Sequence, residues 1–504
     1  MEYIIVQAGG RGSRLKQLTE NKPKALVPVD NLPILFHLFR KYPDRKFVII
    51  ADYKEDVMRR YLAAFADVEY QVVPAEGTGT CAGIQRALEQ IPADCALMLI
   101  WSDLILPDGF ELPAGYGSGE TARDDYVGIS ETFPCRWSFI AGDFWEKPSK
   151  ENGVAGFFLF SDKSKLRSVP ESGEFVEWLQ AERKAFRTVS LAGTREVGLL
   201  AEYEKLGRQV CRPFNRISVS DGVLTKEPVD SQGEKLAQWE RNWYKKAAEY
   251  NSGLLPRIDC YEPLKMEYIQ GGPVYSLDLP YEKKRTLLEQ LVRSLQELHQ
   301  FEKVPAEPAS IKEAYYTKTM DRLSKIGALV PFAGEREITI NGRTCRNVLF
   351  HTQELEARLE ALECEAFHLI HGDCTFSNLL LREDGRPVLI DPRGYFGHTA
   401  LYGDQRYDWA KLYYSIVGNY DRFNLKEFSL HIGSSPKEGA RLEIASNGWE
   451  ALEGEFFRLT GAEKWEIKLL HAIIWLSLTT YAWQDYDSIC GAFYNGLFYL
   501  EEIL

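Results

Sequence analysis

Apolar and polar positions in the N-terminal part of the chain predict strands and helices in alternation. Short runs rich in Ile, Val and Leu, such as YIIVQ and KFVIIA, are separated by stretches whose apolar residues recur every three or four positions. The first pattern is typical of buried strands and the second of amphipathic helices. Strands are expected at 4–7, 46–52, 68–73 and 96–103, and helices at 32–42, 53–65 and 81–91. This alternation predicts an α/β domain with a mostly parallel sheet, with ligands at the carboxyl ends of its strands.

The pattern changes near residue 208. Two β-like runs there are joined by Asp221 and Gly222, a dipeptide typical of a hairpin, and a helical pattern follows over 233–250. A chain of 504 residues is also too long for one ordinary core. We therefore expect one domain over 1–207 and a second, of α+β type, over 208–504.

The stretch QAGGRGSRLKQLTENKPKALVPV follows the first predicted strand. Its glycines would let backbone N–H groups approach phosphate oxygens, and its basic side chains would surround them with positive charge. A tight turn with a solvated basic face would give the same pattern. Asp103 ends the strand ALMLIWSD, where an acidic side chain suits a Mg²⁺ ion that bridges nucleotide phosphates, or simply a helix cap or turn.

The glycine-rich stretch resembles the signature G-G-x-G-x-R-L-x-x-L-T-x-x-x-P-K-x-L of the sugar-phosphate and phosphocholine nucleotidyltransferases. The resemblance implies a Rossmann-like domain that joins a phosphomonoester to an NTP and releases pyrophosphate. Arg14 and Lys24 would neutralise the transferring phosphates, and Asp103 would hold Mg²⁺. Glu196 is the nearest match to a second metal ligand, which is an Asp in the family. Nucleotide contacts are implied for Ala8, Gly9, Gly10 and Gly12 and, in the turn EGTGT, for Glu76, Gly77 and Thr78.

A second cluster of polar residues lies in HLIHGDCTFSNLLLREDGRPVLIDPRG. Asp373 follows one apolar strand, Asn378 comes five residues later, and Asp391 ends a second apolar strand. Two Asp and an Asn at adjacent strand ends can hold Mg²⁺ and orient a hydroxyl toward the γ-phosphate of ATP. Lys226 on the hairpin and Glu240 on the next helix could place the other phosphates, as in a kinase, or could both be surface residues.

This segment resembles the H-G-D-x-x-x-x-N and I-D-x-x signature of the aminoglycoside phosphotransferase and choline kinase superfamily. The resemblance implies a two-lobed, protein-kinase-like domain. The implied roles are catalytic base for Asp373, metal ligands for Asn378 and Asp391, a phosphate-placing pair for Lys226 and Glu240, and an adenine-binding hinge for KMEYIQGG with Glu267 and Tyr268. The sequence PRG that follows Asp391 departs from the family pattern and leaves the acceptor open.

Two further features bear on the acceptor. Asp404 and Asp408 could bind it, or could cap a helix. The C-terminal run WLSLTTYAWQDYDSICGAFYNGLFYL is rich in aromatic residues, which are usually core but could form a cage for a quaternary ammonium group.

The two resemblances together predict a bifunctional enzyme. One half would phosphorylate a small alcohol, amino alcohol or sugar with ATP, and the other would couple the product to an NTP, with CTP as the first candidate, to give a CDP-choline-like precursor for surface polysaccharide. An alternative is an amino-sugar or hexose 1-kinase joined to a UTP- or GTP-dependent transferase. Another is a regulatory or binding protein with one silent domain, against which the intact set of Asp373, Asn378 and Asp391 argues.

Composition restricts the partners further. The formal net charge is -13 and no run of Lys and Arg stands out, so nucleic acid is not an expected partner. No signal peptide and no apolar window of membrane-spanning length is evident, so no membrane partner is expected. The nine cysteines form no CxxC pair, which fits the reducing cytoplasm.

Overall fold

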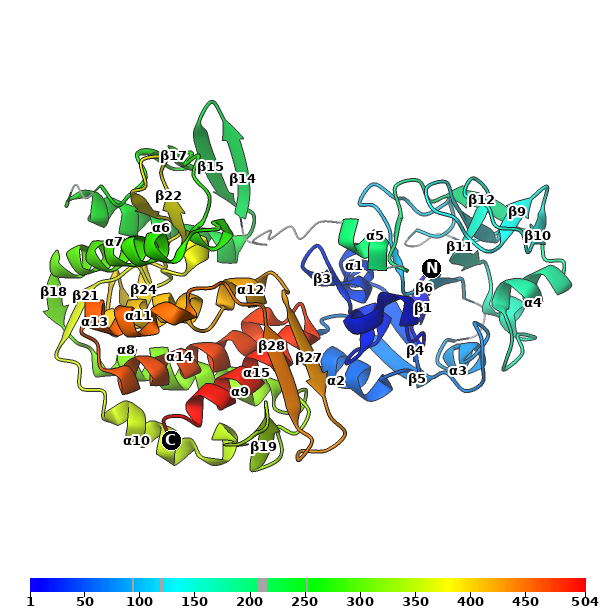
Figure 1. The fold of residues 1–504 in the computed structure, drawn as a ribbon. Helices are drawn as coiled ribbons and strands as arrows, with labels where there is room; N and C mark the ends of the chain where they lie inside the picture. Colours follow the sequence, from blue (N-terminus) through cyan, green and yellow to red (C-terminus); the bar gives the residue numbers. More distant parts are fainter. Residues whose placement is uncertain (93–94, 118–120, 199, 206–214, 251–252) are drawn as a thin grey trace. The chain divides into compact units, whose positions relative to one another are not determined.

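The computed structural model describes residues 1–92, 95–117, 121–198, 200–205, 215–250 and 253–504 (Figure 1). The chain divides into two compact units. Unit 1 comprises Met1–Gln209 and Gln484–Asp487, and unit 2 comprises Val210–Trp483 and Ser488–Leu504. The expected boundary between residues 207 and 208 lies outside the described residues.

A mixed, centrally parallel sheet forms the core of unit 1. Its parallel part has the strand order β5-β4-β1-β6, and β11 pairs antiparallel with β6. The strands are β1 (Tyr3–Gln7), β4 (Lys46–Ala51), β5 (Tyr70–Pro74), β6 (Leu97–Trp101), β8 (Tyr126–Ser130), β9 (Ser138–Ile140), β10 (Asp143–Trp145), β11 (Gly153–Phe160) and β12 (Arg187–Ser190). The helices are α1 (Ile34–Lys41), α2 (Glu55–Phe65), α3 (Ile84–Glu89), α4 (Phe175–Ala181) and α5 (Leu200–Lys205). The predicted α/β class and parallel sheet are confirmed.

The register of this sheet brings the ends of its central strands together. Gln7, the last residue of β1, lies opposite Ile50 of β4 and Trp101 of β6. The N–H of Ala8 donates to the carbonyl of Ile50 at 2.9 Å, which extends the pairing into the glycine-rich loop. That loop and Asp103 therefore leave the sheet at the same edge.

Unit 2 begins with a small antiparallel sheet. Its strand order is β14-β15-β17-β16, with β14 (Asn215–Ser220), β15 (Val223–Pro228), β16 (Ile258–Tyr261) and β17 (Leu264–Glu267). Asp221 and Gly222 have φ values of 52° and 75°, the left-handed pair that a two-residue hairpin turn requires, so the predicted hairpin is confirmed. Helix α6 (Ser231–Ala248) follows this hairpin.

The rest of unit 2 is mainly helical. Its helices are α7 (Tyr281–Gln300), α8 (Pro308–Lys312), α9 (Lys318–Ile326), α10 (Thr352–Glu360), α11 (Gln405–Ile416), α12 (Tyr420–Asn424), α13 (Glu453–Thr460), α14 (Lys464–Leu478) and α15 (Tyr486–Leu500). Short strands β21 (Ala366–Leu369), β22 (Leu379–Leu381) and β23 (Pro387–Leu389) carry the motif that contains Asp373 and Asp391. A sheet lobe followed by a helical lobe is the two-lobed arrangement that the sequence predicts (Figure 1).

The apolar segment near residues 469–483 forms α14 and the turn after it. Trp475 of α14 is fully buried, and so are Phe493 and Tyr494 of α15, as expected for core aromatics. Within the part of the chain that the structure describes, no helix has both the length and the apolar character needed to cross a bilayer.

Candidate active sites

The glycine-rich loop of unit 1 folds tightly over Lys24. Gly12 has φ = 66°, and a Cβ atom at this position would lie 3.0 Å from the Cβ of Lys24. The Thr19 hydroxyl donates to the Gly12 carbonyl at 3.2 Å and holds the turn closed. Glycine is therefore needed here both for its conformation and for its lack of a side chain.

Lys24 and Asp103 meet at the carboxyl edge of the sheet. The Nζ atom of Lys24 lies 2.7 Å from Oδ2 of Asp103, and both side chains are largely buried. Oδ1 of Asp103 is also buried and accepts no hydrogen bond from any described residue. A buried carboxylate oxygen without a partner is costly, and a Mg²⁺ ion that also binds substrate phosphates would satisfy it.

Glu196 lies on the two-stranded ribbon that extends from Asp103. Its strand, β13 (Arg195–Glu196), pairs with β7 (Leu104–Ile105), and the N–H of Val197 donates to the Asp103 carbonyl at 2.9 Å. Burial, followed by the negative charges of Glu196 and Asp103, raises the pKa of the Cys135 thiol to about 12. Both carboxylates are thus close to this thiol, and Glu196 stays a prediction for the second metal ligand.

The other predicted residues of unit 1 surround this edge. Arg14 is exposed on the 3₁₀ turn Ser13–Thr19. The turn EGTGT is tied to β1, because the Gln7 side-chain amide donates to the Thr80 carbonyl at 2.7 Å. The Glu76 carboxylate is engaged by Arg86 at 2.8 Å. The Thr78 N–H donates to the Ser172 hydroxyl at 3.0 Å and its carbonyl accepts from the N–H of Gly173 at 2.8 Å, so nucleotide binding by this turn stays a prediction.

Three charged side chains converge in unit 2. Nζ of Lys226 lies 2.7 Å from Oε2 of Glu240 and 2.9 Å from Oδ1 of Asp391. Lys226 and Glu240 are 6% and 5% exposed, so the surface alternative for this pair is wrong. A buried Lys226 held by Glu240 fits the phosphate-placing role that the sequence predicts for this pair.

Asp373 and Asn378 lie beside this triad. The Asn378 amide donates to Oδ2 of Asp373 at 2.9 Å, and Nζ of Lys411 lies 3.0 Å from Oδ1 of Asp373. The N–H of Ile390 donates to the Asn378 carbonyl at 3.0 Å, which brings Asn378 next to the strand that ends in Asp391. An amide and a carboxylate at this point form an oxygen-rich set suited to Mg²⁺.

Asp408 has a structural role, and the proposal that it binds the acceptor is wrong. Its buried carboxylate accepts from the N–H groups of His371 and Gly372 at 2.9 and 2.7 Å and contacts His299 at 2.9 Å. Burial acts to raise the pKa of Asp408, but the bond to His299 and the nearby histidines hold it below its ordinary value. Asp404 caps α11 by accepting from the N–H of Arg406 at 3.0 Å, as the helix-cap alternative predicts.

The predicted hinge is held by its own contacts. Glu267 forms an ion pair with Arg382, in which Nη1 lies 3.1 Å from Oε2. The N–H of Tyr268 donates to the Gly222 carbonyl at 2.8 Å, and its side chain is 47% exposed. The Glu267 side chain is therefore already engaged, and adenine recognition at this hinge stays a prediction.

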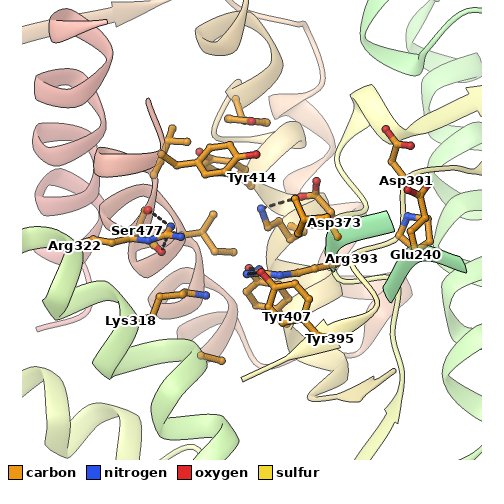
Figure 2. Close-up of a pocket in the computed structure, with 18 of the residues that line it drawn as sticks. Glu240, Lys318, Arg322, Asp373, Asp391, Arg393, Tyr395, Tyr407, Tyr414 and Ser477 are labelled. Atoms are coloured by element: carbon orange, nitrogen blue, oxygen red, sulfur yellow. Dashed lines mark hydrogen bonds and ion pairs between the residues drawn. The ribbon is translucent and has the colours of Figure 1, made fainter. Parts of the chain in front are cut away.

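A cavity of about 340 Å³ extends through unit 2 past Asp373 (Figure 2). Lys226, Glu240 and Asp391 line one end. Basic, hydroxyl-bearing and aromatic residues also line the cavity: Lys318, Arg322, Lys411, Ser477, Tyr395, Tyr407, Tyr414, Tyr420 and Tyr481. Ser477 and Tyr481 belong to the C-terminal aromatic run noted in the sequence, whereas no motif indicated Lys318 and Arg322.

Comparison with known proteins identifies both halves. Residues 4–109 match the MobA-like NTP transferase domain, and residues 251–436 match the phosphotransferase enzyme family. The chain is therefore a fusion of a nucleotidyltransferase domain with a phosphotransferase domain of the aminoglycoside phosphotransferase and choline kinase type, and both halves belong to enzyme families.

The chain spans less than half the length of the curated relatives that it matches. The UTP–glucose-1-phosphate uridylyltransferase AglF of Haloferax volcanii is 36% identical over 104 residues, which are 19% of this chain and 41% of that protein. The glucose-1-phosphate cytidylyltransferase of Salmonella typhimurium is 36% identical over 64 residues, 12% of this chain and 25% of that protein. The crystal structure of HddC from Yersinia pseudotuberculosis is 21% identical with a TM-score of 0.34, covering 41% of this chain and 98% of its own.

Proposed function

We propose that this protein makes a phosphomonoester in unit 2 and activates it as a nucleotide diphosphate ester in unit 1. The observation that carries the proposal is the convergence of Lys226, Glu240 and Asp391 on one side of Asp373 within a single cavity. The product of a kinase is the substrate class of a nucleotidyltransferase, so the two reactions form a sequence. The NDP ester would serve as a donor for a transferase that modifies surface polysaccharide.

In the kinase step, the hydroxyl oxygen of the acceptor attacks the γ-phosphorus of ATP. Its bond to phosphorus forms as the bond to the β-phosphate oxygen breaks, ADP leaves, and the hydroxyl proton passes to Asp373. Lys226, oriented by Glu240, places the phosphates. Mg²⁺ held at Asn378 and Asp391 would offset the negative charge of the phosphates.

In the transfer step, a phosphomonoester oxygen attacks the α-phosphorus of the NTP, and the bond to the pyrophosphate oxygen breaks. Lys24 and Arg14 stabilise the charge that develops on the phosphates. Asp103, with Glu196, would hold the Mg²⁺ of this site. Lys24 is positioned for its role by the ion pair with Asp103 and by the turn at Gly12.

Two nucleotides are candidates for the substrate of this step. CTP is the first candidate, because a cytidylyltransferase is among the relatives of this chain. A sugar 1-phosphate with UTP is the second, which the relationship to the Haloferax uridylyltransferase favours.

Paired variants of the full chain test the proposal by mass spectrometry. ATP, CTP, UTP, GTP and Mg²⁺ are supplied with a panel of alcohols, amino alcohols, hydroxy acids and sugars, and separately with their phosphomonoesters. Asp373→Asn should abolish phosphorylation and leave nucleotidyl transfer to a supplied phosphomonoester intact. Asp103→Asn should do the reverse, while the exposed controls Asp278→Asn and Asp108→Asn should change neither.

Two results would contradict the proposal. Loss of both activities in each single variant, with the fold intact, would rule out independent sites. Full retention of every measurable function in both variants would favour a binding or regulatory protein with a silent domain.

A further inference from the structure

The cavity of unit 2 has more positive than negative side chains. Its carboxylates are already compensated, because Lys226 pairs with Glu240 and Asp391, and Lys411 pairs with Asp373 at 3.0 Å. Lys318, Arg322 and Arg393 line the same cavity, and no described carboxylate lies within ion-pair distance of any of them. This basic end stands out in a chain with a formal net charge of -13.

Neutral groups hold the two guanidinium groups of this set in place. Nη1 of Arg322 donates to the Ser477 hydroxyl at 3.0 Å. Arg393 donates to the hydroxyls of Tyr407 and Tyr395, each at 2.8 Å. The backbone N–H of Lys318 donates to the Glu313 carbonyl, but its Nζ atom makes no hydrogen bond or ion pair with any described residue. Their hydrogen bonds thus fix the guanidinium groups without neutralising them.

Helix α9 carries two of the charges in an arrangement that disfavours the helix itself. Lys318 and Arg322 are four residues apart, so their like charges face one another on the same side of α9. A π-helical turn, Glu313–Thr317, immediately precedes Lys318, and such turns are frequent at functional sites. An anion bound between the two side chains would remove their repulsion.

The electrostatics of the free protein agree with this arrangement. Burial, and then the charges of Arg393, Arg322 and Lys411, hold the pKa of Lys318 well below its ordinary value. Burial and the charge of Arg393 also lower the pKa of Arg322. A negative ligand in the cavity would raise the pKa of both groups and so stabilise their charged forms.

The basic end is on the acceptor side of the catalytic residue. Figure 2 shows Lys318, Arg322 and Ser477 on the opposite side of Asp373 from Glu240 and Asp391. ATP phosphates placed by Lys226 would therefore approach Asp373 from one side, and the hydroxyl acceptor from the other.

Three of the tyrosines that line the cavity already contact cations of the protein itself. The guanidinium of Arg393 lies 4.4 Å from the ring centroid of Tyr395, and Nζ of Lys411 lies 5.6 Å from that of Tyr414. Tyr407 has both cations within 6 Å of its ring centroid. A quaternary ammonium group would meet rings that already contact the protein's own cations.

We propose that the hydroxyl acceptor of unit 2 carries an anionic carboxylate or phosphate group, bound by Lys318, Arg322 and Arg393. The anionic group anchors the acceptor at the basic end and presents its hydroxyl to Asp373. The phosphoryl transfer is the one described above, so the product is a phosphomonoester with a second negative group. This inference rests on the proposed kinase function and specifies its substrate class.

Acceptors that differ only in the anionic group give the first test. Glycerol, D-glycerate and glycerol 3-phosphate form one set; glucose, glucuronate and glucose 6-phosphate form another; choline and ethanolamine are the cationic arm. With ATP, Mg²⁺ and low salt, at least one anionic member should have a kcat/KM on the order of a hundredfold above its neutral counterpart. The carboxylate and phosphate arms identify which anion is bound. Equal or faster phosphorylation of the neutral or cationic members would overturn the proposal.

Charge variants on α9 give the second test. Lys318→Gln should raise the KM for the anionic acceptor at least about tenfold and leave the KM for ATP unchanged, while Lys318→Arg should restore most of the affinity. Lys325→Gln, an exposed charge change on the same helix, is the matched control and should have no effect.

Calorimetric titration separates this inference from the kinase proposal. Wild-type protein and Lys318→Gln are titrated with inorganic phosphate, D-glycerate and glycerol 3-phosphate. Binding that depends on Lys318 without any phosphorylation would support the anion site and contradict the kinase. Phosphorylation of neutral acceptors without such binding would support the kinase and overturn the anion site. Absence of binding that depends on Lys318 for all three probes would overturn it as well.

Discussion

The ion pair at the centre of unit 2 predicts a large loss of stability when its cation is removed. Lys226 is buried between Glu240 and Asp391, at 2.7 and 2.9 Å from their carboxylate oxygens. The substitution Lys226→Met keeps much of the side chain's length and removes only its charge. Glu240, 5% exposed, would then lose the cation that lies 2.7 Å from its Oε2 atom.

The magnitude follows from the asymmetry of buried ion pairs. Removing one partner of such a pair costs about 3 to 5 kcal/mol, whereas replacing both with apolar residues is often neutral. For a unit of this size the single substitution should lower the midpoint of thermal unfolding by roughly 5 to 8 °C. The double variant Lys226→Met/Glu240→Leu should recover most of that loss, because Asp391 is partly exposed and can be solvated by water.

Scanning calorimetry of the full chain measures this effect, with the unfolding of unit 1 as an internal reference. Lys235→Met, on the exposed side of α6, is the matched control. Kinase activity should be absent in both the single and the double variant, because the proposed mechanism also needs Lys226 to place the phosphates. The double variant would therefore regain stability without regaining activity. A Lys226→Met midpoint equal to that of Lys235→Met, or a double variant as unstable as the sum of the single ones, would refute the reasoning.

Two further predictions concern other residues. Gly12→Val should reduce nucleotidyl transfer at least about a hundredfold and leave kinase activity unchanged, because the new side chain would displace Lys24. Gly109→Val is the control, since a Cβ atom there meets no neighbouring atom, and it should have no effect. Equal nucleotidyl transfer by the two variants in steady-state assays would contradict this prediction. Asp421, which accepts from the N–H of Ser377 at 2.9 Å, has its pKa raised by burial to about 6. Since this pKa lies above the ordinary Asp value, the native state holds its proton more tightly, and stability should fall as pH rises from 4 to 6. Urea unfolding at pH 4 and pH 7 should show wild type losing up to about 3 kcal/mol relative to Asp421→Asn, and parallel pH profiles for the two proteins would exclude that role for Asp421.

The sequence predicted the parts of the fold whose causes are local. The strands of unit 1 are apolar runs whose buried side chains determine their place in the sheet, and the turn at Asp221 and Gly222 needs two left-handed residues in succession. The glycine-rich loop and Asp103 lie at the same edge of the sheet because β1 and β6 are parallel and paired. The periodicity of apolar residues and the identity of the turn residues are sufficient to predict such features.

The features that the sequence did not predict depend on contacts between distant segments. Asp408 follows Gly372 by 36 residues, and only the fold shows that its carboxylate accepts from the backbone N–H groups of His371 and Gly372. Lys318 lies 55 residues before Asp373 on a helix whose pattern is otherwise ordinary, and its neighbours in the cavity come from α11 and α14. A basic site assembled from separate helices has no signature of its own in the sequence.

Charge distribution connects the two catalytic proposals. The chain is acidic overall, yet Arg11 and Arg14 are exposed around the glycine-rich loop, and unit 2 has uncompensated cations beside Asp373. Uniform repulsion by a net charge of -13 would disfavour every phosphorylated ligand, so local fields must supply the attraction. An acceptor with its own anionic group would be attracted to unit 2 by such a field, and after phosphorylation its greater negative charge would favour the basic loop of unit 1. Both proposed sites would then attract anionic ligands, as two consecutive reactions on one anionic substrate require.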